Sequence, residues 1–293
     1  MSVSASINSV DPVSGLPLRR FSFLGNTRLR LAATMRQPAD RPRAIVVFAH
    51  GFTAFADAYA PVLHALVADG FLVYALDHRG HGASEGKRAS LDRLDDMVED
   101  FERLVALARA EQPALPIFTL GHSMGGLIVA RHAQRFQEGL AGVIPVSAAF
   151  IVGEHISDAT ARLLVGASRL APNLPVIGDD DIAPPRDERQ RRRRVRNIFS
   201  YHGKVRLNMA RELYLGGKAA LEQAPSWELP ILLQHGSDDP VTMPSGSETA
   251  FAQATSRDRT LELWPGRLHN LLTDDGWEEP VQGIIDWIGE RTV

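Results

Sequence analysis

The chain has 293 residues, no cysteine and a formal net charge of −3, with 44% apolar and 23% charged residues. This length and composition fit a globular protein with one large α/β domain or two smaller ones. The lack of cysteine excludes disulfide bonds, thiolate zinc sites and a cysteine nucleophile. The small negative charge argues against nucleic acid as a partner, because nucleic-acid binding requires a basic surface.

Neither a secretory signal nor a membrane span is recognisable in the sequence. The N-terminal residues lack a basic start followed by an apolar core. No apolar run approaches the roughly 18 residues needed to cross a bilayer. We therefore expect a soluble, cytoplasmic protein, and peripheral contact with a membrane stays open.

The first half of the chain alternates strand and helix patterns. After a lead of about fifteen residues without a regular pattern, alternating and then continuous apolar runs predict strands, and apolar residues at helical spacing predict the helices between them. The predicted strands cover about 18–24, 28–35, 44–50, 71–76, 116–120 and 142–147, and the predicted helices about 57–69, 91–110 and 124–136. This order predicts a parallel sheet covered by helices on both faces.

The alternation stops between about 150 and 225. This region contains helical patterns at about 155–170, 186–200 and 203–215, separated by prolines, and no buried-strand pattern. Strands return at about 230–235 and 260–264, with helices at about 245–254 and at the C terminus. We therefore predict a sheet domain formed by residues 1–150 and 226–293. A helical insertion at 151–225 would cover the carboxyl ends of its strands, where open α/β sheets bind ligands.

The most informative motif is Gly-His-Ser-Met-Gly at residues 121–125. A G-x-S-x-G motif between a strand and a helix holds the serine on a sharp, strained turn, and the two flanking residues must be small. The hydroxyl of Ser123 then lies at the start of a helix, where the helix dipole favours negative charge. We interpret Ser123 as a catalytic nucleophile.

A nucleophilic serine needs a histidine base and an acid that orients it, and in such folds the acid and then the histidine follow the serine along the chain. His269 follows the last predicted strand, and Asp238 and Asp239 follow the preceding one. We predict Asp239 as the orienting acid, because Pro240 holds it extended. Asp238 is its rival, and we expect it to shape the loop.

The oxyanion of an acyl-transfer intermediate needs two hydrogen-bond donors. The backbone N–H of Met124 is the first candidate. The second is the N–H of Phe52, after His50-Gly51, although His-Gly could also be only a turn. No histidine has metal-site spacing, so no metal is expected.

These motifs resemble the monoacylglycerol lipase group of α/β-hydrolases, relatives of lysophospholipases. The resemblance covers most of 25–150 and 200–290. It rests on His50-Gly51, Tyr74-Ala-Leu-Asp-His-Arg-Gly-His-Gly-Ala-Ser84, Gly121-His-Ser-Met-Gly-Gly126 and Gly236-Ser-Asp-Asp239, with Tyr201-His-Gly-Lys204 similar to the cap segment of bacterial members.

The resemblance implies an α/β-hydrolase fold with a mostly parallel eight-stranded sheet, helices on both faces and a helical cap after the sixth strand. It further implies a serine hydrolase that cleaves monoacylglycerols or similar lipid-like esters through an acyl-enzyme, with a mobile cap and no cofactor. It also assigns the triad of Ser123, Asp239 and His269, and the oxyanion amides of Phe52 and Met124.

Three departures from the family pattern put the exact substrate in doubt. Thr53-Ala-Phe-Ala replaces a polar loop, Asn270 follows the histidine where glutamate is common, and the cap carries an arginine run at 186–196. That run is either a solvated helix face or a surface for anionic lipid headgroups. Lysophospholipase, thioesterase and aminopeptidase-like activities stay open, as does a catalytically silent binding protein.

Overall fold

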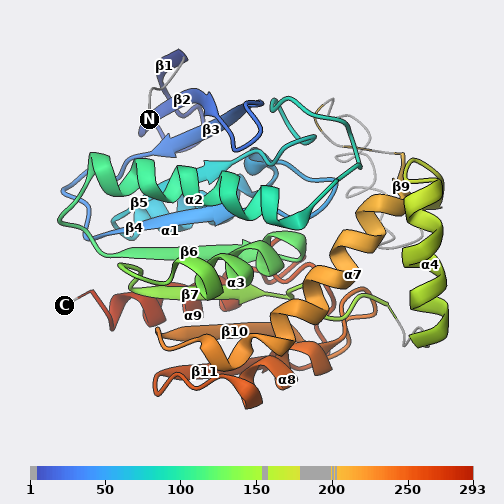
Figure 1. Cartoon of the computed structure of the whole chain (residues 1–293). Coiled ribbons are helices and arrows are strands. Elements are labelled where there is room, and N and C mark those ends of the chain that lie inside the picture. Colours follow the sequence, from blue (N-terminus) through green and yellow to red (C-terminus); the bar gives the residue numbers. More distant parts are fainter. Residues whose placement is uncertain (1–4, 154–157, 179–198, 200, 202, 293) are drawn as a thin grey trace.

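The structure, a computed structural model, describes residues 5–153, 158–178, 199, 201 and 203–292 and is built on a nine-stranded sheet (Figure 1). The strand order is β1-β2-β3-β5-β4-β6-β7-β10-β11. The six strands from β5 to β11 in this order run parallel, and β1, β2 and β3 add antiparallel pairs. The strands are β1 (Ala5–Val10), β2 (Pro17–Leu24), β3 (Arg30–Arg36), β4 (Ala44–Ala49), β5 (Phe71–Leu76), β6 (Ile117–His122), β7 (Gly142–Val146), β10 (Ile231–Gly236) and β11 (Arg259–Trp264).

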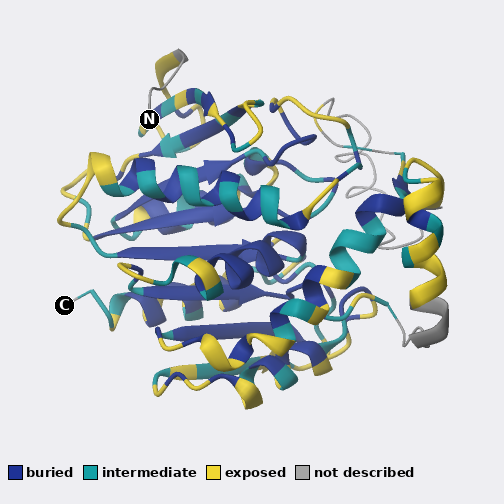
Figure 2. Ribbon diagram, viewed as in Figure 1, coloured by how far each residue is buried: buried dark blue, intermediate teal, exposed yellow. Residues whose placement is uncertain are grey.

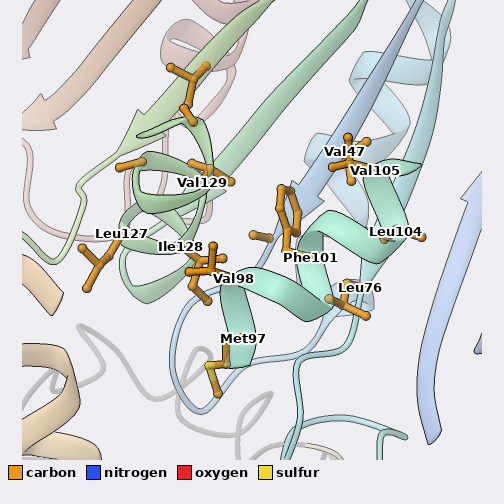
Figure 3. Close-up of a cluster of buried hydrophobic side chains, with 14 of the residues drawn as sticks. Val47, Leu76, Met97, Val98, Phe101, Leu104, Val105, Leu127, Ile128 and Val129 are labelled. Carbon is orange, nitrogen blue, oxygen red and sulfur yellow. The ribbon is translucent and has the colours of Figure 1, made fainter. Parts of the chain in front are cut away.

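Helices cover both faces of this sheet, as the strand–helix order predicts. On one face lie α2 (Leu94–Glu111), α3 (Met124–Phe136) and α8 (Pro244–Gln253); on the other lie the short helix η1 (Ala56–Tyr59), α1 (Ala60–Ala68) and α9 (Glu278–Gly289). Figure 3 shows Phe101 of α2 and Ile128 of α3 in one apolar cluster with Val47 and Leu76 from the strands. Burial on both faces explains why β4, β5, β6, β7 and β10 have every residue buried. The predicted α/β-hydrolase fold is confirmed.

The sheet has one strand more than the eight predicted. The additional strand, β1, pairs with β2 from Ala5 opposite Ser22 to Val10 opposite Pro17. Residues 6–10 of β1 are all exposed (Figure 2). Because neither face of β1 is buried along these residues, the sequence there needs no alternation of apolar and polar residues. Backbone hydrogen bonds and the Ser9 hydroxyl, which donates to the Leu18 carbonyl, hold this edge, so periodicity could not predict it.

The insertion follows β7, the sixth of the eight predicted strands. It contains α4 (Asp158–Leu170), β8 (Pro175–Gly178), β9 (Lys204–Arg206), α7 (Leu207–Glu222) and the short helix η2 (Ala224–Ser226). The antiparallel pair β8–β9 was not predicted. Because β9 occupies Lys204–Arg206, the helix expected at 203–215 begins only at Leu207, and it continues to Glu222. The expected helix at 186–200 and the arginine run lie outside the described residues.

The insertion contacts the loops that follow the parallel strands. The Tyr201 amide donates to the Thr53 carbonyl after β4, and the rings of Phe55 and Phe199 lie 5.7 Å apart. Lys87, after β5, donates to the side chain of Asn173. Among the helices of the described residues, none is both long and apolar enough to cross a bilayer.

Candidate active site

Ser123 occupies a strained turn between β6 and α3. Its φ is 57° and its ψ is −119°, a backbone conformation that residues with side chains rarely adopt. A Cβ on Gly121 would lie 2.2 Å from the Gly125 carbonyl oxygen, and one on Gly125 would lie 2.1 Å from the carbonyl oxygen of Ala49. The turn therefore accepts only glycine at these two positions, which is the physical basis of the G-x-S-x-G pattern.

Replacing Gly125 with alanine should destabilise the fold by about 3 kcal/mol, because the new methyl group collides with backbone that cannot move aside. Gly166 in α4 is the matched control, since nothing lies within 4 Å of a Cβ added there. Gly166→Ala should change the free energy of unfolding by no more than about 1 kcal/mol. Urea denaturation measures both variants, and equal effects would contradict the steric explanation.

The structure brings Ser123, His269 and Asp239 into one hydrogen-bonded chain. The Nε2 atom of His269 lies 2.9 Å from the Ser123 hydroxyl oxygen, and its Nδ1 lies 2.7 Å from Oδ2 of Asp239. Each residue follows the carboxyl end of a parallel strand: β6, β11 and β10. Since these ends share one edge of the sheet, residues 146 positions apart in the chain meet there.

The two candidate carboxylates differ sharply in environment. Asp238 is exposed and accepts a hydrogen bond from the Ser237 hydroxyl. Asp239 is only 2% exposed. Its Oδ1 accepts the backbone N–H groups of Val241 and Thr242, and its Oδ2 also accepts the Thr242 hydroxyl. The local geometry therefore favours Asp239 as the acid that orients His269.

Asp239 is ionised at neutral pH. Burial acts to raise the pKa of its carboxyl group, but hydrogen bonds from His235 and His269 outweigh that effect, and the pKa lies well below its usual value. An ionised carboxylate accepts the Nδ1 proton of His269. This leaves the lone pair of Nε2 directed at Ser123, as a general base requires.

The candidate oxyanion amides lie on either side of the serine turn. Met124 is the first residue of α3, so its N–H has no carbonyl partner within the helix. The loop before Phe52 lies against the turn, since a Cβ on Gly51 would be 3.3 Å from Cβ of Ser123. The role of these two amides stays a prediction.

His122 and Tyr59 connect the three loops of the site. The Gly51 N–H donates to the Tyr59 hydroxyl, which in turn donates to Nδ1 of His122. Nε2 of His122 donates to the backbone carbonyl of His269. The sequence predicts only an architectural role for His122, and it gives no reason to select Tyr59.

His235 also contacts the site, although the sequence indicates only a lone buried histidine. Its Nε2 lies 3.0 Å from Oδ2 of Asp239. The one available signal is its place at the end of a buried strand, four residues before the acid. Within the described residues, no cluster of three or more His, Asp and Glu side chains could hold a metal ion.

Buried histidines make folding stability depend on pH. Burial lowers the pKa of His50 to about 4 and the pKa values of His81 and His122 to about 3, from a reference value of 6.5. As pH falls below 6.5, the unfolded chain binds protons that the folded protein does not, so stability decreases until the folded-state pKa values are reached.

Lowering the pH from 7 to 5 should therefore cost about 2 kcal/mol of stability for each of these histidines. Burial raises the pKa of Asp77, which opposes part of the loss. Urea denaturation at the two pH values measures the net change. A free energy of unfolding that is equal or higher at pH 5 would contradict this account.

The fold and the site together define an α/β-hydrolase. Its features are a parallel sheet with this strand order, a serine on the strained strand–helix turn, and a histidine held by a buried carboxylate. The model of the family described as "Serine aminopeptidase, S33" matches residues 40–276. The chain belongs to this family of α/β-hydrolases and is an ester hydrolase of that type.

Several relatives and solved structures support this assignment. The monoacylglycerol lipase of Mycolicibacterium smegmatis is 33% identical over 91% of this chain and 95% of its own length. The crystal structure of the monoacylglycerol lipase of Paleococcus ferrophilus has a TM-score of 0.77 and 25% identity, covering 89% of this chain and 99% of that one. A soluble variant of the Saccharomyces cerevisiae monoglyceride lipase, 19% identical, shares the fold with a TM-score of 0.81 over 100% of this chain and 98% of that one.

Proposed function

We propose that the chain hydrolyses monoacylglycerols through an acyl-enzyme formed on Ser123. The observation that carries this proposal is the hydrogen-bonded chain from Ser123 through His269 to Asp239. The ester preference is supported by the monoacylglycerol lipase of Mycolicibacterium smegmatis, which is similar along nearly its whole length.

The reaction begins when the Ser123 oxygen attacks the ester carbonyl carbon. His269 accepts the hydroxyl proton at Nε2, and the Asp239 carboxylate stabilises the imidazolium that results. The amides of Phe52 and Met124 donate to the oxyanion of the tetrahedral intermediate. His269 then gives its proton to the glycerol oxygen, the carbon–oxygen bond breaks, and the acyl group stays on Ser123.

Deacylation repeats these steps with water as the nucleophile. His269 removes a proton from water, which attacks the acyl carbon of the ester on Ser123. Collapse of the second tetrahedral intermediate releases the fatty acid, and the proton returns through His269 to the serine oxygen. No cofactor takes part in this sequence.

Residues 151–225 serve as the cap over the acyl-binding path. The support is their contact with the loops after β4 and β5, together with large apolar side chains that the insertion leaves exposed. Leu163 is 72% exposed and Leu170 is 91% exposed, both on α4. Side chains of this kind suit contact with a lipid surface, so the cap is the part that would meet a membrane or micelle.

The aminopeptidase alternative follows from the description of the family. It requires acidic side chains that receive the amino terminus of a peptide. The insertion contains acidic residues that could do this, but Glu154 and Asp179 to Asp181 lie outside the described residues, and the same holds for the side chain of Asp158. Within the described residues, no specific observation therefore favours this activity, nor lysophospholipase or thioesterase activity, over monoacylglycerol hydrolysis.

Rates on a substrate series test the proposal. Monoacylglycerols with short to long acyl chains should be cleaved faster than lysophospholipids, acyl thioesters or aminoacyl amides. The rates on monoacylglycerols should also vary with acyl-chain length, because a binding path of fixed length accommodates some acyl chains better than others. Ser123→Ala protein gives the background rate. Faster cleavage of an aminoacyl amide than of every monoacylglycerol would overturn the proposal.

A further inference from the structure

The Asp239 carboxylate contacts a second histidine besides His269. His235 is the fifth residue of β10, it has no exposed surface, and its Nε2 lies 3.0 Å from Oδ2 of Asp239. This is the same oxygen that accepts the Nδ1 proton of His269. Two imidazole rings from different parts of the chain therefore share one carboxylate oxygen.

The hydrogen bonds of His235 determine which of its nitrogens carries the proton. Nε2 faces two acceptors, Oδ2 of Asp239 and the Thr242 carbonyl oxygen at 2.9 Å. Neither acceptor carries a hydrogen, so Nε2 must be the protonated nitrogen. Nδ1 lies 2.7 Å from the hydroxyl oxygen of Ser247 in α8, which can donate a hydrogen bond to it. The two acceptors thus make Nε2 of His235 a donor aimed at the carboxylate, while Ser247 holds the other ring nitrogen.

We infer that His235 is a positioning residue for catalysis, which acts through Asp239 and contacts neither substrate nor the reacting atoms. This inference rests on the proposed function, because it assigns Asp239 the role of orienting His269. The hydrogen bond from His235 holds Oδ2 in line with Nδ1 of His269. It also draws part of the negative charge of the carboxylate away from His269.

The removal of this hydrogen bond has two separable consequences. The carboxylate loses a donor that fixes its position, so fewer molecules hold His269 correctly and kcat falls while KM stays nearly unchanged. The remaining charge acts more strongly on His269, so His269 binds a proton at higher pH. The acid limb of the pH–rate profile should therefore move upward in pH.

Few other charged or titratable groups face this carboxylate. Asp239 receives its remaining hydrogen bonds from Val241 and Thr242 of its own loop. At the end of β6, His122 has its ring 5.0 Å from that of His269, and burial lowers the pKa of His122 to about 3. His122 is therefore neutral across the working range and does not contribute a competing charge.

Two variants and a control test the inference. His235→Leu removes the donor while keeping side-chain volume, whereas His235→Gln puts an amide N–H where Nε2 lies. His132→Leu is the matched control, because His132 is also fully buried and contacts a carboxylate, Glu102, at 2.6 Å but lies away from the site. The pH dependence of kcat and kcat/KM on a p-nitrophenyl ester is measured for each variant, with the melting temperature as a check of folding.

His235→Leu should lower kcat about ten- to a hundredfold, the effect of losing a hydrogen bond to a charged group, and should shift the acid limb to higher pH. His235→Gln should restore most of kcat and the original limb. His132→Leu should lower the melting temperature without moving the limb. Should His235→Leu not fold, His235→Asn serves instead, since its shorter side chain places the amide near the position of Nδ1, beside Ser247, and leaves Asp239 without this donor; it should move the limb in the same direction.

An unchanged acid limb in folded His235→Leu or His235→Asn, with the wild type active, would overturn the role of His235. The role would also be contradicted if His235→Gln did not regain the kcat that His235→Leu loses. Failure of the wild type itself to hydrolyse the ester would instead refute the proposed function, so the two failures are distinguishable.

Discussion

Ser123→Ala is expected to lower kcat about a millionfold, because the nucleophile and the base act as one unit and the reaction cannot form an acyl-enzyme without the hydroxyl. KM for a monoacylglycerol should change little, since the substrate still binds. The protein should fold normally, because Ser123 is only half-buried and alanine is smaller than serine. Steady-state kinetics and a thermal melt measure these effects.

Ser237→Ala provides the control for Ser123→Ala. Ser237 is an exposed serine in the loop that carries the acid, and its hydroxyl contacts Asp238 and the Gly266 amide. Its removal should leave kcat within a factor of about three, the scale of small surface effects. If Ser123→Ala kept more than about a hundredth of wild-type activity, Ser123 would not be the nucleophile.

Asp239→Asn is expected to lower kcat about ten-thousandfold, the second-largest effect. An asparagine amide that faces His269 donates where the carboxylate accepts, so His269 takes the wrong tautomer and its Nε2 carries the proton. That proton faces the Ser123 hydroxyl and prevents its activation. The neighbouring donors of His235 and Thr242 also lose an ionised acceptor, so the melting temperature should fall.

Asp238→Asn separates the two acids. Asp238 is exposed, and among the hydrogen bonds of the described residues its carboxylate accepts only the one from the Ser237 hydroxyl, so its replacement should leave kcat within a factor of about three. Equal losses from both substitutions would show that the loop as a whole, rather than one carboxylate, supports catalysis.

The parallel strands and the meeting of Ser123, Asp239 and His269 at one edge of the sheet were predictable because both leave direct marks in the sequence. A strand buried on both faces needs an uninterrupted apolar run, as in β4 and β5. A serine at positive φ needs glycine on both sides, as Gly121 and Gly125 provide. Strand order then places the loops after β10 and β11 beside the serine turn.

Features held by backbone pairing or by long-range contacts left no such mark. The edge strand β1 is exposed along residues 6–10 and therefore has no apolar face. In the β8–β9 pair, Pro175, Val176 and Lys204 are exposed while Val205 is buried, so no continuous buried apolar run marks it either. His235 became part of the site only through contacts with Ser247 on α8 and with Asp239, and neither partner is evident from local sequence.

Labelling with a fluorophosphonate tests the role of Ser123 most directly, because this reagent modifies only a serine whose hydroxyl a neighbouring base has activated. Mass spectrometry of the digested, labelled protein should find the phosphonyl group on the peptide that contains Ser123. The Ser123→Ala protein should remain unlabelled. If the native, folded protein took up no label, or took it up at a different residue, Ser123 would not be the nucleophile.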